Sequence, residues 1–244
     1  MKNKILVTGG SGYIGSHTIV DLQQHGFEVL CVDNFSRSDA RMLKGIEKST
    51  GKAVHHTTLD LCDAQATRNF FEAHQDIVGV IHFAAFKSVP ESVAHPQRYY
   101  HNNIESLLNL LDAIQLYEIP NLVFSSSCSV YGNIEQLPVT EETPLPKPES
   151  PYAATKQMGE QILRDFCKAN PTKVIALRYF NPVGAHPNGF IGELPIDRPN
   201  NLVPIITQTA IGIQEAMYVW GGDYNTRDGS CIRDYIHVCD VAHA

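Results

Sequence analysis

The chain has 244 residues, of which 43% are hydrophobic and 18% are charged, and its formal net charge is −7. These proportions are typical of a globular protein, and the negative charge argues against nucleic acid or an anionic membrane as the main partner. We expect a cytoplasmic protein, because no apolar run reaches the ~18 residues of a membrane span, no signal peptide precedes the first predicted strand, and the six cysteines lack C-x-x-C spacing.

A βαβ unit opens the chain. A β-rich run at 5–8 precedes the sequence GGSGYIG at 9–15, a helix is predicted over 16–25, and a second strand over 27–32 ends at Asp33. This order and a length of about 30 residues are typical of a dinucleotide-binding unit.

The glycines of this unit fit both common spacings, through Gly10, Gly12 and Gly15 or through Gly9, Gly12 and Gly15. Small residues let the backbone approach a pyrophosphate, and the start of the helix offers unpaired N–H groups with partial positive charge. An aspartate at the end of the second strand accepts hydrogen bonds from both ribose hydroxyls and repels a 2′-phosphate. Asp33 therefore predicts NAD rather than NADP, the alternative being a simple turn residue.

Strands and helices continue to alternate along the next 150 residues. We predict a helix capped by Ser38-Asp39 and ending near 50, a strand at 53–59 leading to Asp60 and Leu61, a helix from Asp63 to about 74, a strand at 77–85, a helix at 92–119 broken near Pro96, a strand at 121–124, a loop at 133–150, a helix at 152–169 and a strand at 174–180. This alternation predicts an α/β fold with a doubly wound parallel sheet, whose ligands bind at the carboxyl ends of the strands.

Two stretches predicted to lie at that edge carry candidate catalytic groups. The sequence SSSCSVYG at 125–132 places small hydroxyls, including Ser127, after a buried strand, while Tyr152 and Lys156 share one face at the start of a helix. Moving the pKa of a phenol from ~10 toward neutrality requires roughly 4 kcal/mol, which a close ammonium and a positively charged cofactor can supply in a partly dry site. The alternative is that the spacing of Tyr152 and Lys156 arises by chance, as it does on many helices. The other polar groups predicted at the strand ends argue against this alternative.

After residue 180 the composition changes to a region rich in Pro, Gly and Asn. We divide the chain into an NAD-binding Rossmann domain at 1–180 and a partial substrate-binding region at 181–244, with a helix at 202–213 and a strand at 218–220. Asn201, Trp220 and Arg233 offer amide hydrogen bonds, ring stacking and a diphosphate clamp. The alternatives for these three are a loop amide, a core aromatic and a surface charge. Asp240 is predicted to cap a further helix that is only begun, so we expect that the chain is incomplete at its C-terminal side.

Seven runs of the sequence resemble the UDP-glucose 4-epimerase family of the extended short-chain dehydrogenase/reductases. They are VTGGSGYIGSH at 7–17, DN at 33–34, FSSS at 124–127, SPYAATK at 150–156, RYFNPVGAHP at 178–187, PNNL at 199–202 and RDYIHV at 233–238. The resemblance implies tightly held NAD, no metal, and reversible interconversion of UDP-galactose and UDP-glucose through a transient 4-keto sugar.

The resemblance also implies residue roles. Tyr152 takes the proton of the sugar 4-hydroxyl, Lys156 binds the nicotinamide ribose and favours the phenolate, and Ser127 hydrogen-bonds the sugar oxygen. The implied cofactor-binding residues are Gly9, Gly12, Tyr13, Ile14, Gly15, Asp33, Asn34, Asp60, Leu61, Phe83, Ala84, Ala85, Lys87, Asn102, Ser127, Tyr152, Lys156 and Phe180. The implied substrate-binding residues are Lys87, Ser127, Tyr152, Asn181, Asn201, Leu202, Tyr218, Trp220 and Arg233. A homodimer paired through the 92–119 and 152–169 helices is implied as well.

Two other readings remain open at this point. A nucleotide-sugar 4,6-dehydratase needs an acidic residue after the Ser/Thr to eliminate water, and Cys128-Ser129 stand at that position. An inactive NAD-binding fragment is the second alternative, favoured by the expected truncation and disfavoured by the intact Ser127, Tyr152 and Lys156.

Overall fold

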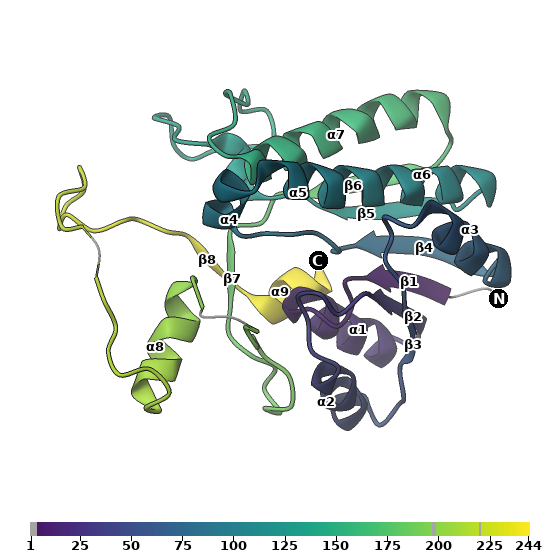
Figure 1. Cartoon of the computed structure of the whole chain (residues 1–244), viewed down its shortest axis with the longest axis horizontal. Helices are drawn as coiled ribbons and strands as arrows, with labels where there is room; N and C mark the ends of the chain where they lie inside the picture. Colours follow the sequence, from purple (N-terminus) through teal and green to yellow (C-terminus); the bar gives the residue numbers. More distant parts are fainter. Residues whose placement is uncertain (1–3, 197–198, 220) are drawn as a thin grey trace.

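The computed structural model describes residues 4–196, 199–219 and 221–244 and is built around one parallel sheet (Figure 1). The six strands lie in the order β3-β2-β1-β4-β5-β6, which confirms the predicted doubly wound arrangement. Their bounds are β1 (Lys4–Thr8), β2 (Glu28–Asp33), β3 (His55–Thr58), β4 (Ile77–His82), β5 (Asn121–Ser125) and β6 (Lys173–Leu177).

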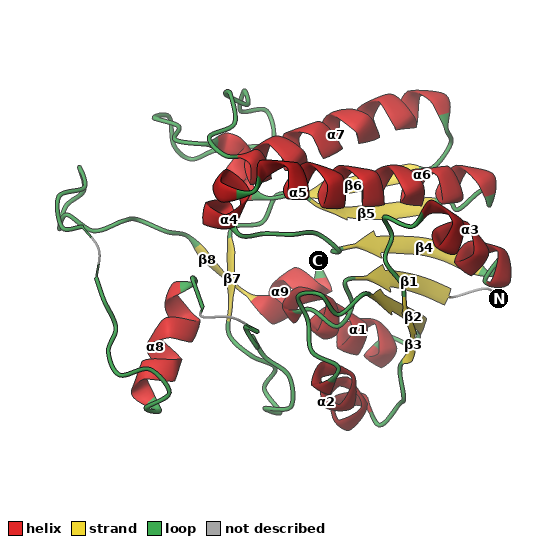
Figure 2. Ribbon diagram, in the orientation of Figure 1, coloured by secondary structure: helices red, strands yellow, loops and turns green. Residues whose placement is uncertain are grey.

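Helices cover both faces of the sheet (Figure 2). On one face α1 (Tyr13–Gln24) and α2 (Arg41–Thr50) enclose an apolar cluster, and on the other α3 (Ala64–Ala73), α6 (Ser106–Leu116) and α7 (Pro151–Ala169) enclose a second one. Leu6 and Val7, two neighbouring residues of β1, show why an apolar cluster forms on each face of the sheet. Leu6 belongs to the α3/α6/α7 cluster and Val7 to the α1/α2 cluster, because successive side chains of a strand point to opposite faces. Both side chains are fully buried, as expected for a parallel strand.

The predicted helix at 92–119 is a series of shorter segments, as its proline suggests. It consists of α4 (Val89–Ala94), α5 (Pro96–Tyr100), a π-helical turn η1 (His101–Glu105) and α6. Pro96 begins α5, which confirms the predicted break. The first segment begins earlier than predicted, because the Ser88 side chain accepts a hydrogen bond from the Glu91 N–H and caps it.

Side-chain caps decide where several helices begin. The Asp63 carboxylate accepts from the Ala66 N–H and caps α3, as predicted. The Ser150 hydroxyl caps α7 in the same way. The cap of α2 predicted at Ser38-Asp39 forms in part, because α2 begins at Arg41, whose N–H donates to Asp39 Oδ1 at 2.8 Å, whereas the Ser38 hydroxyl donates to Asp33.

The region after residue 180 forms a small two-stranded parallel sheet of β7 (Asn181–Val183) and β8 (Tyr235–His237), with α8 (Leu202–Ala210) and α9 (Val238–His243). The predicted strand at 218–220 is wrong for Tyr218 and Val219, which lie in an irregular segment of the described chain, while Trp220 lies outside the described residues. Asp240 does not begin the last helix. The His237 ring accepts from the Cys239 N–H and caps α9, so that Asp240 lies within its first turn.

This region also contributes to the core of the sheet domain. α9 packs against α1, and the buried Ile191 joins the α1/α2 cluster beside Met42 and Ile46. The division at residue 180 therefore stays a prediction. Within the described ranges, no helix combines the length and apolar character needed to cross a bilayer.

Candidate active site

The carboxyl ends of the strands bring the predicted residues to one edge of the sheet. The strand order reverses between β1 and β4, and open parallel sheets bind ligands beside that point. Gly9 follows β1, Asp33 ends β2, Asp60 follows β3, the segment 83–87 follows β4, and Ser127 follows β5. β3, β4 and β6 end earlier than predicted, at Thr58, His82 and Leu177, and the segments beyond them contribute to this edge.

The glycine loop is packed so closely that side chains do not fit. Gly9 has a left-handed φ of 66°, and a Cβ built on it would lie 2.7 Å from the Ala84 nitrogen. A Cβ on Gly15 would lie 2.3 Å from the Gly9 carbonyl oxygen. Gly12 precedes α1 and offers no side-chain cap, so the first N–H groups of that helix remain available for an anion.

We expect Gly15→Ala to disrupt this loop, because its methyl group meets the backbone rather than a flexible side chain. Such overpacking costs about 1–3 kcal/mol in unfolding free energy, and displacement of the loop should weaken NAD binding by on the order of 10-fold or more. Urea unfolding and a dinucleotide titration measure the two effects. Gly222→Ala is the matched control, since no atom lies within 4 Å of a Cβ built there; equal effects of both variants would contradict this account.

Asp33 is buried and held in a fixed orientation over the glycine loop. Its Oδ2 accepts from the Ser11 N–H at 3.0 Å, and its Oδ1 accepts from the Phe35 N–H at 2.9 Å and from the Ser38 hydroxyl at 2.8 Å. Sequence reasoning missed Ser11 and Ser38, because their role depends on the approach of the two loops. The Asn34 amide donates to Asp60 at 3.2 Å and thus links the ends of β2 and β3.

Ser127, Tyr152 and Lys156 come together as predicted. Ser127 caps a 3-10 turn, η2 (Cys128–Tyr131), where its hydroxyl accepts from the Ser129 N–H at 3.2 Å, and it lies close enough to Tyr152 to act on the pKa of that phenol. The Lys156 Nζ lies 5.9 Å from the centre of the Tyr152 ring and donates to the Ser125 carbonyl oxygen at 2.7 Å.

Burial decides the protonation of this pair in the absence of a ligand. Burial raises the pKa of Tyr152, and the nearby Ser127 hydroxyl partly offsets this rise. Burial also lowers the pKa of Lys156 to about 8. The ammonium donates to a backbone carbonyl rather than to the phenol. The chain's own residues therefore favour the protonated phenol, and the phenolate needs a further positive charge from a bound ligand.

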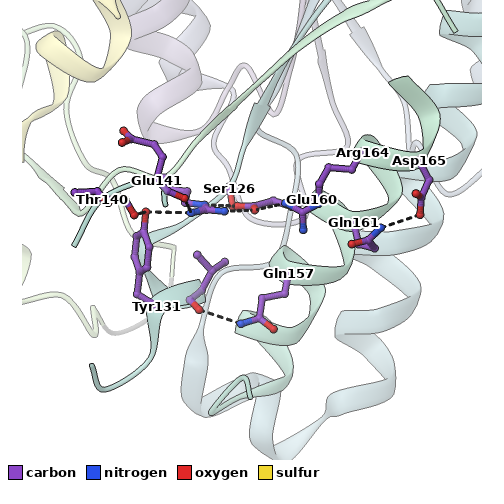
Figure 3. Close-up of polar contacts among 11 residues, drawn as sticks. Ser126, Tyr131, Thr140, Glu141, Gln157, Glu160, Gln161, Arg164 and Asp165 are labelled. Atoms are coloured by element: carbon purple, nitrogen blue, oxygen red, sulfur yellow. Dashed lines mark hydrogen bonds and ion pairs between the residues drawn. The ribbon is translucent and has the colours of Figure 1, made fainter. Parts of the chain in front are cut away.

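A buried ionic network lies next to the segment that carries Ser127. The sequence analysis did not identify this network. Glu160 of α7 accepts from the Ser126 hydroxyl at 2.6 Å and from both Nε and Nη2 of Arg178, at 2.8 and 2.6 Å. Arg178 also donates to the Tyr131 hydroxyl at 3.1 Å. Figure 3 shows this row of contacts, from Thr140 and Tyr131 to Ser126 and Glu160. The network ties the ends of β5 and β6 to α7 beside Ser127.

The predicted substrate residues are brought together only in part. The Asn201 amide donates to Glu193 Oε1 at 2.8 Å, and the Lys87 Nζ lies 3.5 Å from the same oxygen. The Asn181 amide donates to the Asp234 carbonyl oxygen at 2.8 Å and joins β7 to β8. Leu202, Tyr218 and Arg233 are exposed, and Trp220 lies outside the described residues.

The other predicted cofactor residues are partly or fully buried. The Tyr13 hydroxyl donates to the Gly184 carbonyl oxygen at 2.6 Å, which connects the first turn of α1 with the loop after β7. The rest of this set consists of Ile14, Leu61, Phe83, Ala84, Ala85, Asn102 and Phe180.

Comparison with known proteins agrees with this geometry. A model of the NAD dependent epimerase/dehydratase family matches residues 5–244. The chain is 50% identical over 239 residues to the UDP-glucose 4-epimerase of Bacillus subtilis, covering 98% of this chain and 70% of that protein. It is 47% identical over 241 residues to the UDP-glucose 4-epimerase of Dictyostelium discoideum, and this match covers 98% of this chain and 70% of that protein.

Solved structures of such enzymes superpose closely. The UDP-glucose 4-epimerase of Bifidobacterium longum in complex with NAD+ and UDP gives a TM-score of 0.95 at 44% identity, covering 98% of this chain and 71% of that one. The UDP-glucose 4-epimerase of Brucella ovis in complex with NAD gives a TM-score of 0.89 at 39% identity. This match covers 98% of this chain and 70% of that one.

Proposed function

The chain belongs to the NAD-dependent epimerase/dehydratase family, and we propose that it interconverts UDP-galactose and UDP-glucose with Ser127, Tyr152 and Lys156 as its catalytic residues. It is an NAD-dependent enzyme that epimerises a UDP-sugar at C4. The observation that supports the residue assignment is that Ser127 follows β5 and that Lys156 Nζ lies 5.9 Å from the centre of the Tyr152 ring, at the carboxyl edge of the sheet. The test is conversion of UDP-galactose by the purified chain into UDP-glucose, followed by chromatography.

NAD fits the residues present. The glycine loop leaves the space that a Cβ would fill, and the Asp33 carboxylate lies at the end of β2, where the ribose hydroxyls of a dinucleotide are bound. When bound, NAD accepts a hydride from the sugar C4 and returns it. Its positive nicotinamide ring also provides the charge that the phenol of Tyr152 requires.

The chain's own residues handle the proton and the position of the sugar. Tyr152 Oη takes the proton of the 4-hydroxyl as C4 loses its hydride, which leaves a ketone at C4. Ser127 Oγ hydrogen-bonds the same oxygen, and Lys156 holds the nicotinamide ribose. After the 4-keto sugar has turned over, Tyr152 returns the proton to the oxygen, while bound NAD would supply the hydride to the opposite face of the ring.

Turning a sugar over requires a firm hold on the nucleotide and a loose hold on the hexose. Amide groups, an arginine and aromatic rings suit the uracil and the diphosphate. We assign this hold to Lys87, Asn181, Asn201, Leu202, Tyr218, Trp220 and Arg233. The 4,6-dehydratase alternative remains less favourable, because Cys128 and Ser129 supply no acid for the elimination of water.

Asp33→Ala is expected to relax the preference for NAD over NADP by roughly 10–100-fold, because two charge-assisted hydrogen bonds to ribose are lost together with the repulsion of a 2′-phosphate. Titration with both dinucleotides measures the ratio of their dissociation constants. Glu28→Ala is the control, since Glu28 is an exposed acid at the opposite end of the same strand. An unchanged ratio in the Asp33 variant would show that Asp33 does not contact the ribose.

A homodimer through the 92–119 and 152–169 segments is part of the proposal. Val93 of α4, Leu108 and Leu116 of α6, and Met158 of α7 are exposed apolar side chains on these helices, and burying them in a second copy is favourable. Sedimentation at increasing concentration should therefore show a dimer, weakened by Leu108→Glu. A monomer at every concentration would contradict it.

The cellular setting follows from the substrate and the thiols. We assign the protein to galactose metabolism because UDP-galactose is the proposed substrate. We assign it to the cytoplasm because its six cysteines are free, as they are in a reducing compartment.

A further inference from the structure

The end of α1 and the end of α9 together carry a cluster of three metal-ligating side chains, far from the proposed catalytic residues. Asp21 and His25 lie one turn apart at the carboxyl end of α1, and His243 lies in the last turn of α9. One ligand atom from each of the three lies within 4.8 Å of the other two. In Figure 1, α9 (yellow) crosses α1 (purple) close to the point marked C.

The carboxylate of Asp21 is shared between the two imidazoles. Its Oδ2 lies 3.4 Å from His25 Nδ1, and its Oδ1 lies 3.2 Å from His243 Nδ1. The two rings face each other with their centres 5.3 Å apart. The three side chains therefore surround one small volume instead of forming separate surface pairs.

The hydrogen bonding of His25 prepares the ring for a metal. Its Nδ1 lies 2.8 Å from the Asp21 backbone carbonyl oxygen, so Nδ1 donates there and Nε2 is the nitrogen left for a metal. Histidine ligands of metals commonly donate their second N–H to a carbonyl in this way. Bond lengths of ~2.1 Å place tetrahedral ligand atoms about 3.4 Å apart. The exposed rings of His25 and His243, 53% and 69% accessible, are free to close that difference.

We propose that Asp21, His25 and His243 bind a divalent transition-metal ion, with Zn²⁺ as the ion best suited to them. Two imidazole nitrogens and one carboxylate oxygen suit Zn²⁺ and its first-row neighbours, whereas Ca²⁺ and Mg²⁺ prefer oxygen ligands. Three protein ligands leave a fourth position for water. The site lies one helix length from the glycine loop, about 18 Å for 12 residues at 1.5 Å each, so it is separate from the reaction.

The consequence of binding is a link between the two parts of the fold. α9 follows β8 directly, β8 pairs with β7, and β7 begins at Asn181 of the proposed substrate site. A metal that bridges α1 and α9 therefore fixes this small sheet against the sheet domain. Because the ion binds only the assembled pair of helices, it stabilises the folded state.

Titration of the purified chain with Zn²⁺, followed by calorimetry and by thermal unfolding, tests the proposal without any measurement of activity. We expect one saturable site and a Tm that rises with Zn²⁺ but not with Mg²⁺. Asp21→Asn and His243→Gln should each weaken the binding by at least about 10-fold, since even residues that only support metal ligands change affinity by 10–100-fold. Co²⁺ in place of Zn²⁺ should give the visible absorption of a tetrahedral site, and this should be lost in both variants.

His101→Gln is the matched control, because His101 faces Glu105 one helical turn away at 3.5 Å, in a pair of the same kind. It should bind Zn²⁺ like the unmodified chain. If Asp21→Asn and His243→Gln fold normally by circular dichroism and bind Zn²⁺ as tightly as the control, the three side chains form surface ion pairs only and the proposal is overturned. A rise in Tm with Zn²⁺ that persists in both variants would overturn it equally.

Discussion

Tyr152→Phe is expected to lower kcat for conversion of UDP-galactose by a factor of ~10²–10⁴, the range for loss of a general acid–base group. The phenylalanine keeps the ring and its packing at the start of α7 but has no oxygen to take the proton of the 4-hydroxyl. NAD should remain bound, because the glycine loop and Asp33 are untouched. Initial rates and the absorbance of the bound dinucleotide give the two readouts.

Tyr117→Phe is the control for this experiment. The Tyr117 hydroxyl makes only a long contact of 3.5 Å, with the Arg68 carbonyl oxygen, after the end of α6. We expect its activity to be unchanged. Turnover of the Tyr152 variant at the rate of this control would remove Tyr152 from the mechanism.

Arg178→Ala is expected to destabilise the fold by about 3–5 kcal/mol, because it leaves the Glu160 carboxylate buried without its ionic partner. Glu160 is only 3% exposed and accepts two hydrogen bonds from Arg178. Urea unfolding at neutral pH measures the change in the free energy of unfolding. Arg164→Ala is the control, since Arg164 is half exposed, lies 3.6 Å from the same carboxylate, and should contribute about 1 kcal/mol or less.

The pH dependence of this effect has a defined sign. Burial by itself raises the pKa of Glu160, but the hydrogen bonds from Arg178 and Ser126 hold that pKa below its usual value. The stabilisation is therefore present above the unfolded-state pKa of about 4.3 and is lost as the pH falls below it. The difference between Arg178→Ala and the unmodified chain should narrow toward pH 4. A difference that is small at neutral pH, or that grows on acidification, would contradict the role of this pair.

Local signals explain why most of the sheet domain is predictable. Each buried strand is a short apolar run, and Asp63 and Ser150 mark helix starts because their caps involve residues only three positions away. The strand order follows from the alternation of elements. The ends of β4 and β6 are less predictable, because the apolar residues at 83–85 and 179–180 continue the strand pattern but lie beyond the last paired residues, His82 and Leu177.

Contacts between distant segments explain what the sequence does not reveal. In the sequence, Glu160 is one of several charged residues on an amphipathic helix. Its contacts with Arg178 and Ser126 form only when the chain has folded. The protonation of Tyr152 depends on burial, which the spacing of Tyr152 and Lys156 does not report. Tyr218 and Val219 illustrate a third limit, since a short β-rich run inside a region rich in turns does not by itself form a strand.

In the proposed reaction, the hydride removed from C4 returns to the same carbon within one site. The most direct measurement uses UDP-galactose carrying deuterium at C4, with the product examined by mass spectrometry and NMR. The account predicts UDP-glucose that retains the deuterium at C4 with inverted configuration. UDP-glucose that has exchanged this label with solvent, or bound NAD without any UDP-glucose, would contradict it.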